Sequence, residues 1–229
     1  SARNNEDLLA VKNQLVHPSQ SAIITLDLTD PSSLQKASEQ YQSEIKYCDG
    51  IIHCGGISQR AQAIDTPISV TRKIFESNFF GHLPLTQTVL PGMIQQGSGK
   101  IIVISSLTGK WGFYLRSSYS ASKHALHGYY DTLRMEVSKM GIDVHIVTPG
   151  FIATDISKHA ITHDGTTTGS MDDNQANGIS AENCAAQIIR GIEKNKEEFG
   201  VGGKETFSLF LHRYFPRIFK KILIKQSAR

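Results

Sequence analysis

The 229-residue sequence has no apolar run of about 18 residues, the length that a membrane-spanning helix of the usual kind needs. Its first seven residues contain no apolar stretch of the kind found in a secretory signal peptide. Its three cysteines, Cys48, Cys54 and Cys184, are scattered and lack metal-ligand spacing. We therefore expect free thiols, no metal site and a reducing compartment, either the cytoplasm or the cytoplasmic face of a membrane.

An excess of one charge is also missing, because 24 Lys and Arg oppose 21 Asp and Glu. Six of the basic side chains lie in residues 207–229, which hold no acidic one, so the rest of the chain is net acidic. A basic body, the usual mark of a nucleic-acid-binding domain, is absent, and we expect no nucleic-acid partner. With 39% hydrophobic residues, the chain is long enough for one well-buried domain.

Short apolar runs alternate with segments of helical periodicity. The apolar runs predict buried strands at 21–28, 50–54, 100–106, 142–147 and 198–202. The periodic segments predict helices at 34–45, 70–93, 119–140 and 181–194. Residues 162–178, rich in Thr, Gly, Asp and Asn, indicate a mobile loop. This alternation is typical of an α/β protein with a parallel sheet and crossover helices.

The strongest chemical signal is the segment Tyr119-Ser120-Ala121-Ser122-Lys123, with Ser106 thirteen residues upstream at the end of a predicted strand. Tyr119 and Lys123 are four residues apart, so their side chains share one face of a helix. A neighbouring ammonium favours the phenolate and lowers the pKa of a tyrosine. Tyr119 could then exchange a proton with a hydroxyl or carbonyl group, while Ser106 binds the same oxygen. An ordinary, partly exposed Tyr–Lys pair is the alternative, since this spacing often arises by chance.

These residues, together with the strand at 101–106, resemble the core of the short-chain dehydrogenase/reductase family. Further segments match the family's order and spacing: Asp27-Leu28-Thr29-Asp30, Asn78 in a long helix, and Pro149-Gly150-Phe151-Ile152-Ala153-Thr154. The resemblance implies a single-domain, Rossmann-like, doubly wound parallel sheet over residues 1–206. It is nearest to lipid- and steroid-handling members such as 11-beta-hydroxysteroid dehydrogenase and, closer still, to mammalian dehydrogenase/reductase members that share Gly56-Ile57-Ser58-Gln59-Arg60.

The resemblance also implies roles for these residues. Tyr119 would be the general acid and base, Lys123 would hold the nicotinamide ribose, and Ser106 would orient the substrate carbonyl. Asn78 would support a water-linked proton relay to Lys123, although a solvent-facing asparagine is the alternative. The cofactor site would comprise Arg3, Asp27, Leu28, Cys54, Gly55, Tyr119, Lys123, Pro149, Gly150, Ile152 and Thr154. Family members commonly form dimers or tetramers, so a homo-oligomer is expected.

The sequence departs from the family in lacking the glycine loop Thr-Gly-x-x-x-Gly-x-Gly. The first strand, the first helix and most of the second strand are missing from it, so we expect a piece of a longer chain or a truncated product. Unpaired strand edges and the loss of a phosphate-binding helix N-terminus would follow. Cys54 also replaces a structural asparagine, and it is expected to be a small, buried thiol without redox or metal chemistry. A cofactor-incompetent homologue that acts by binding a partner is therefore the alternative function.

Arg3 lies just past the end of what would be the second strand of the family fold, and it indicates which dinucleotide is used. A guanidinium there can pair with the ribose 2′-phosphate, whereas NAD-dependent proteins favour an acidic residue. This favours NADP(H), although Arg3 could also be a solvated surface residue.

The substrate is expected to be a lipophilic carbonyl compound or alcohol, such as a steroid, a retinoid or a lipid-like ketone. Ser106, Tyr119, Trp111 and Phe113 would contribute to an apolar pocket, and Phe151, Ile156 and Ile161 would belong to a lid over it. Residues 207–229 form a basic amphipathic segment interrupted by Pro216. This segment could contact a membrane surface, the protein's own core or a second subunit.

Overall fold

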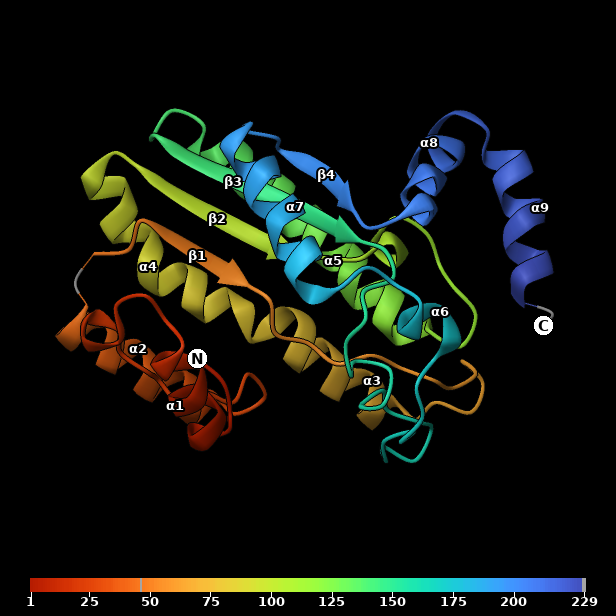
Figure 1. Cartoon of the computed structure of the whole chain (residues 1–229), viewed down its shortest axis with the longest axis horizontal. Helices are drawn as coiled ribbons and strands as arrows, with labels where there is room; N and C mark the ends of the chain where they lie inside the picture. Colours follow the sequence, from red (N-terminus) through yellow and green to blue (C-terminus); the bar gives the residue numbers. More distant parts are fainter. Residues whose placement is uncertain (46, 228–229) are drawn as a thin grey trace.

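A parallel four-stranded sheet forms the centre of the computed structural model, which describes residues 1–45 and 47–227 (Figure 1). The strands, in spatial order, are β1 (Gly50–His53), β2 (Gly99–Ile104), β3 (Ile142–Pro149) and β4 (Glu198–Val201). All three neighbouring pairs are parallel. Buried aliphatic residues fill β2 and β3 on both faces, as a sheet covered by helices on two sides requires. The predicted α/β class and Rossmann-like sheet are confirmed.

Helices connect and flank these strands. The α-helices are α1 (Asn5–Asn13), α2 (Pro31–Glu44), α3 (Ile68–Phe75), α4 (His82–Gln96), α5 (Ser117–Val137), α6 (Asp173–Ala176), α7 (Ala181–Glu193), α8 (Phe207–Tyr214) and α9 (Pro216–Ser227). Shorter turns of helix are η1 (Pro18–Gln20), η2 (Glu76–Phe80), η3 (Leu107–Gly109) and η4 (Lys204–Thr206), of which η2 is π-helical.

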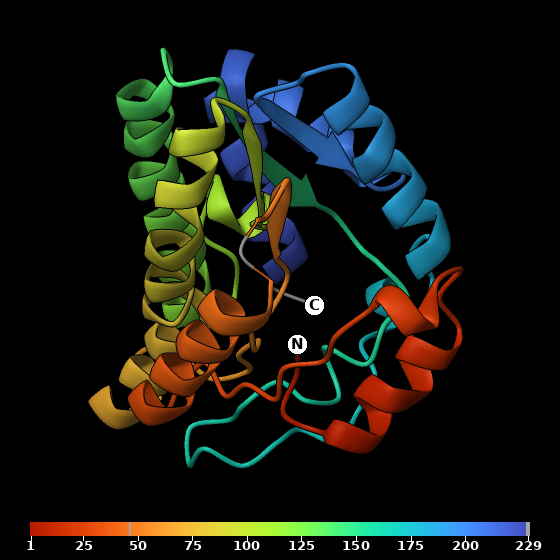
Figure 2. The ribbon, with the colours of Figure 1, turned by 90° about the vertical axis from the view of Figure 1, so that its left-hand side faces the viewer.

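The helices form layers on both faces of the sheet (Figure 2). On one face, α4 and α5 pack against β2 and β3 through a core that includes Met93, Val103 and Tyr130. On the other face, α7 packs through a smaller core that includes Cys184, Val147 and Phe199. The two cores hold the carboxyl ends of β2 and β3 rigidly, and these are the strand ends from which Ser106 and Pro149 emerge.

Two predicted segments differ from the observed elements. The single helix expected over 70–93 is instead the succession α3, η2 and α4, because a π-helical turn interrupts it at 76–80. The loop expected over 162–178 contains the short helix α6. Its N-cap is Asp172, whose side chain accepts a hydrogen bond from the Asn174 amide, and such an N-cap stabilises a helix start.

The strand predicted at 21–28 is wrong. Thr25 makes one isolated bridge with Ala2, and no longer ladder forms in this segment. A strand needs a neighbour that takes its backbone hydrogen bonds over several residues, and within 1–45 and 47–227 no such neighbour lies alongside it. Leu26 is nevertheless buried, in a small cluster with Leu34 and Ala37 of α2.

Strand β1 lies at the edge of the sheet. In the part of the chain that the structure describes, no strand pairs with its outer side. Ile52, whose neighbour across the pairing is the buried Ile102, is 59% exposed on the face that α7 covers farther along. An uncovered parallel edge of this kind is what the missing glycine-loop region led us to expect.

Candidate active site

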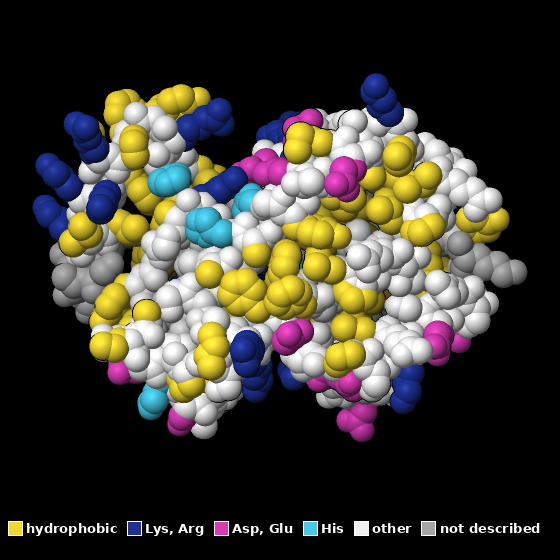
Figure 3. Space-filling model, turned by 180° about the vertical axis from the view of Figure 1, so that it is seen from behind, with side chains coloured by type: hydrophobic (Ala, Val, Ile, Leu, Met, Phe, Trp, Pro, Cys, Tyr) yellow, Lys and Arg dark blue, Asp and Glu magenta, His cyan; other side chains and the backbone are white. Residues whose placement is uncertain are grey.

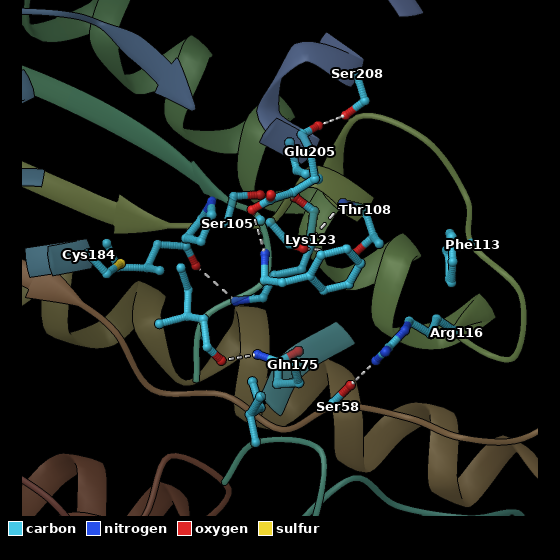
Figure 4. A pocket seen from close by; sticks show the side chains of 18 of the residues that line it. Ser58, Ser105, Thr108, Phe113, Arg116, Lys123, Gln175, Cys184, Glu205 and Ser208 are labelled. Atoms are coloured by element: carbon cyan, nitrogen blue, oxygen red, sulfur yellow. Dashed lines mark hydrogen bonds between the residues drawn. The ribbon is translucent and has the colours of Figure 1, made fainter. Parts of the chain in front are cut away.

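Ser106, Tyr119 and Lys123 line one cavity at the carboxyl ends of β2 and β3. Figure 4 shows Lys123 in this cavity together with other lining residues such as Ser105 and Arg116. Ser106 is the second residue after β2, and Tyr119 and Lys123 lie in the first two turns of α5. Both α5 side chains are buried, at 7% and 5% exposure. The Lys123 Nζ donates a hydrogen bond to the Ile104 carbonyl (2.9 Å) and lies 5.9 Å from the centre of the Tyr119 ring. The expected shared helix face therefore forms, and it points into the cavity.

The electrostatics at Tyr119 involve groups beyond those that the residue spacing indicated. Burial raises the pKa of Tyr119, whereas a hydrogen bond with Ser106 and the charges of Arg116 and Arg60 lower it. Burial also lowers the pKa of Lys123 to about 8. Arg116 and Arg60, which the residue spacing did not point to, are therefore cations that favour the Tyr119 phenolate, and the expected contribution of Lys123 stays a prediction. Lys123 is held by the carbonyl at the end of β2.

Arg116 and Arg60 belong to a network beside Tyr119. Asp172, which caps α6, forms an ion pair with Arg60 and lies 3.7 Å from Arg116. Arg116 also donates to the Ser58 hydroxyl (2.7 Å). Two guanidinium groups thus share one carboxylate, which leaves a net positive charge next to the phenol. Burial lowers the pKa of Arg116 to about 10, so it remains charged at neutral pH.

Asn78 lies in the π-helical turn η2 and is fully buried, which excludes the solvent-facing alternative. Its side chain accepts from the Ile57 amide (2.7 Å) and donates to the Ile57 carbonyl and the Ser122 hydroxyl (both 3.0 Å). These bonds attach the turn after β1 to α5. A Cβ atom on Gly56 would lie 3.0 Å from Asn78 Oδ1 and 3.5 Å from Lys123 Nζ, so this close approach depends on glycine.

The predicted cofactor residues fall into two groups. Cys54, Pro149, Gly150, Ile152 and Thr154 line the same cavity as Tyr119 and Lys123. Glu205 fixes the turn after β3, because its Oε1 atom accepts from the Phe151 amide (3.0 Å). Cys54 is exposed, so the expectation that it is a buried thiol is wrong; it lies in the turn that follows β1, at the edge of the sheet. Cys184 is buried, and both are free thiols.

The second group is Arg3, Asp27, Leu28 and Gly55, which lie outside the lining of that cavity. Leu28 is in contact with the turn after β1, since a Cβ atom on Gly55 would lie 2.5 Å from the Leu28 Cδ1 atom. Hydrogen bonds from Thr29 and the charge of Arg3 lower the pKa of Asp27. Arg3 itself is exposed and borders a separate shallow hollow with Asn4 and Asp7.

The cavity has a volume of about 640 Å³, within the range of small-molecule sites. Trp111, Phe113, Phe151 and Ile156 line it, as the sequence led us to expect. Ile161 does not, which corrects its assignment to the lid. It packs in a separate core with Val70 and Ile74 of α3, since its backbone pairs with residues 58 and 60.

Several lining residues have no sequence signal that we recognised. Arg116 precedes Tyr119 by three residues but belongs to no motif, and Glu205 lies on a short 3-10 turn. The C-terminal segment also closes one side of the cavity, through Phe207, Leu211, Phe219, Ile222 and Leu223. The apolar stripe of this segment was a usable signal for its place in the cavity wall, because packing on the protein's own core was one of the alternatives that the sequence left open.

Helices on both faces of a parallel sheet, with a tyrosine–lysine pair where the strands end, define a Rossmann-type α/β protein. The model of the family described as short chain dehydrogenase matches residues 1–165. The chain therefore belongs to the short-chain dehydrogenase/reductase family, a family of oxidoreductases.

Among similar proteins is dehydrogenase/reductase SDR family member 7B of Danio rerio, 35% identical over 207 residues, with 90% of this chain and 67% of that protein covered. Dehydrogenase/reductase SDR family protein 7-like of Drosophila melanogaster is 33% identical over 228 residues, with 99% and 69% covered. The chain thus spans about two thirds of the length of these relatives.

Solved structures show the same fold. A short-chain dehydrogenase from Streptomyces avermitilis matches with a TM-score of 0.75 at 24% identity, over 99% of this chain and 88% of the other. A short chain dehydrogenase from Burkholderia cenocepacia, solved in complex with NADP, matches with a TM-score of 0.72 at 19% identity, over 87% and 77%.

Proposed function

We propose that this chain carries the catalytic part of an NADP(H)-dependent reductase or alcohol dehydrogenase that acts on a lipophilic carbonyl compound or alcohol. The observation that carries the proposal is the joint placement of Ser106, Tyr119 and Lys123 in one largely apolar cavity. A bound nicotinamide would supply or accept the hydride. The relatives' family and the NADP-bound fold neighbours support a nicotinamide cofactor.

The protein's own groups handle the proton and the orientation of the substrate. The Tyr119 hydroxyl gives a proton to the carbonyl oxygen during reduction and takes one from the hydroxyl during oxidation. The Ser106 hydroxyl binds the same oxygen and stabilises the charge that develops on it. Arg116 and Arg60 favour the phenolate form of Tyr119. Asn78 fixes the turn at Ile57 against α5, and this turn keeps Gly56 beside Lys123.

The cavity fits the nicotinamide end of a dinucleotide. Lys123 places a buried ammonium group in it, Gly56 has no side chain that would approach that ammonium, and Pro149 and Gly150 also line the cavity. Lys123, Tyr119 and the 149–154 segment would hold this end. The 229 residues contain no glycine-rich phosphate loop, so this proposal includes no group of that type for the pyrophosphate.

The choice of NADP(H) over NAD(H) rests on Arg3, whose guanidinium is exposed and near Asp27. Replacing Arg3 by Asp reverses the charge offered to a 2′-phosphate. We expect the ratio of NADPH to NADH affinity, measured by fluorescence titration, to fall below one in the Arg3→Asp variant. An unchanged ratio would remove the argument for NADP(H).

A second function is favoured by the uncovered edge of β1, where no strand of the described residues pairs with its outer side and Ile52 is 59% exposed. It is a homologue that binds no cofactor and acts through a partner. Titration of the chain with NADPH separates the two. Saturable enhancement of NADPH fluorescence supports the reductase, and no binding at any concentration of NADPH supports the second function.

A further inference from the structure

The C-terminal helices α8 and α9 project from the body of the molecule next to β4 (Figure 1). One side of this C-terminal lobe, residues 207–225, packs on the protein. Phe219 of α9 is 6% exposed and lies edge-on to Trp111, with ring centres 4.7 Å apart, and against His212 of α8. Phe207 and Leu211 of α8 and Ile222 of α9 line the cavity that contains Tyr119. The lobe is therefore both attached to the body and part of the wall of the site.

The lobe also exposes large apolar side chains to solvent. Phe207, Phe210 and Tyr214 recur at the helical spacing of three and four residues, and they are 60%, 46% and 60% exposed. Phe215 and Ile218, at the turn into α9, are 47% and 55% exposed. The Phe210 ring is stacked on that of Phe207 and is tilted against the rings of Tyr214 and Phe215. They form one continuous apolar patch, unlike the scattered apolar residues of an ordinary surface.

Basic side chains accompany this patch. Within the described residues of the lobe, the charged side chains are Arg213, Arg217, Lys220, Lys221 and Lys225, and no acidic residue occurs there. The view from behind shows dark-blue basic side chains beside the yellow hydrophobic ones on this lobe (Figure 3). Exposed aromatic residues flanked by Lys and Arg are the composition of helices that lie in the interface of an anionic bilayer.

A second copy of this chain is a poorer occupant of the same surface. In a twofold dimer the patch would meet itself, so the five cations of each lobe would oppose like charges. An anionic lipid surface complements both the apolar patch and the basic side chains, because it accepts the apolar side chains and neutralises the cations.

We infer that the C-terminal lobe docks on the surface of an anionic membrane and thereby brings the wall of the active-site cavity to the lipid. This inference deepens the proposed function, on which it rests for the lipophilic substrate. The described residues contain no helix with the length and apolar character of a membrane span. The inferred contact is that of the lobe with the leaflet it faces. A substrate dissolved in that leaflet would reach the cavity past Phe207 and Ile222.

The test is co-sedimentation of the full chain with vesicles, without nucleotide. Vesicles of phosphatidylcholine alone are compared with vesicles of equal parts phosphatidylcholine and phosphatidylserine. We expect the chain to bind the second kind and the Lys220→Gln/Lys221→Gln variant to bind them about tenfold more weakly. The control Lys73→Gln/Lys139→Gln, which removes two exposed lysines outside the lobe, should bind like the unchanged chain.

A second pair of variants tests the apolar side. Phe210→Ser/Ile218→Ser should lose binding, whereas Ile64→Ser/Met135→Ser, at exposed positions elsewhere (90% and 70%), should retain it. Equal binding by all variants would overturn the inference. So would a dimer, found by light scattering without lipid, that the Phe210→Ser/Ile218→Ser variant abolishes. NADPH titration of the same samples reports separately on the proposed function, and circular dichroism confirms that each variant is folded.

Discussion

At the scale of single residues, the phenol of Tyr119 experiences opposing influences. Burial raises its pKa, and Ser106, Arg116 and Arg60 lower it. Arg116 lies in the cavity wall and is fixed by Ser58, so its charge is held near the ring. A proton acceptor works best when its pKa is near the working pH. Arg116 acts through Tyr119, whose pKa it lowers, and it is therefore a positioning residue that affects the pH dependence of the reaction.

Replacing Arg116 by Gln removes a charge that favours the phenolate, so the pKa of Tyr119 should rise. We expect the rising limb of alcohol oxidation against pH to move upward by about one pH unit. Arg116→Lys, which keeps a cation, should move it less. Arg72→Gln, at an exposed position on α3, is the control. A profile that is identical in Arg116→Gln and the unchanged enzyme would exclude this role.

Asn78 is a second residue with a measurable effect. In Asn78→Ala, the partly buried amide and carbonyl of Ile57 lose their partners, at a cost of up to about 1–3 kcal/mol for each group left unpaired. We expect the free energy of unfolding in urea to fall by at least about 2 kcal/mol. Asn13→Ala, on the exposed face of α1, should leave it nearly unchanged. Equal stability of the two variants would contradict the assigned contacts.

Residue spacing predicted part of this site and missed the rest. Tyr119, Lys123 and Ser106 come together because an i, i+4 pair and a strand end have fixed geometry. Arg116 and Asp172 are separated by 56 positions in the sequence and meet only through the fold. Burial, which raises the pKa of Tyr119 against the effect of the neighbouring cations, also follows from the fold and not from residue spacing.

At the scale of elements, apolar runs predicted β1, β2, β3 and β4 but failed at 21–28. The four correct strands have parallel neighbours that take up their backbone groups. The segment at 21–28 has an equally apolar sequence but meets Ala2 at a single bridge. An apolar sequence pattern indicates that a segment could be a buried strand. Whether the strand forms depends on a neighbouring strand from elsewhere in the chain that takes its backbone hydrogen bonds.

The π-helical turn η2 was also beyond prediction, because periodicity does not distinguish it from α-helix. Its last bond, from the Gly81 amide to the Glu76 carbonyl (2.8 Å), reflects one extra residue in the turn. Gly81 lies directly against residue 28, since a Cβ atom there would be 2.3 Å from the Leu28 carbonyl oxygen. The contact of η2 with the segment 27–28 therefore requires glycine.

Two glycine variants test this contact. Gly81→Ala forces η2 and Leu28 apart, and we expect it to lower the free energy of unfolding by about 1–3 kcal/mol, as overpacking does. Gly128→Ala, in the exposed interior of α5 with no atom near its Cβ position, should raise it by up to about 1 kcal/mol. The urea midpoints of the two variants measure these opposite shifts. Two shifts of the same sign would contradict the close approach at Gly81.

At the scale of the whole molecule, three buried histidines link stability to pH. Burial lowers the pKa of His53 and of His127 to about 4, and that of His82 to about 3. Between about pH 4 and pH 6.5 these histidines stay neutral in the folded state. In the unfolded chain the same side chains bind protons in this pH window. Stability therefore rises with pH in this window and falls on acidification.

We expect the free energy of unfolding to decrease by at least about 2 kcal/mol between pH 7 and pH 5. His127→Gln removes one of the three groups and should reduce this decrease. His17→Gln, at an exposed position, should not change it. Denaturant titrations at several pH values measure the free energy of unfolding. Stability that is flat from pH 7 to pH 5 would show that the folded state binds protons at these histidines as readily as the unfolded chain does.

The central claim concerns one oxygen atom, the hydroxyl of Tyr119. NADPH oxidation in the presence of a long-chain aliphatic ketone, followed by absorbance, tests it most directly. We predict turnover by the unchanged chain and a loss of at least about 100-fold in Tyr119→Phe, with NADPH binding retained. Tyr129→Phe, which removes a hydroxyl from the same helix outside the cavity, should keep full activity. An unchanged rate in Tyr119→Phe, or no turnover by the unchanged chain with NADPH bound, would contradict the claim.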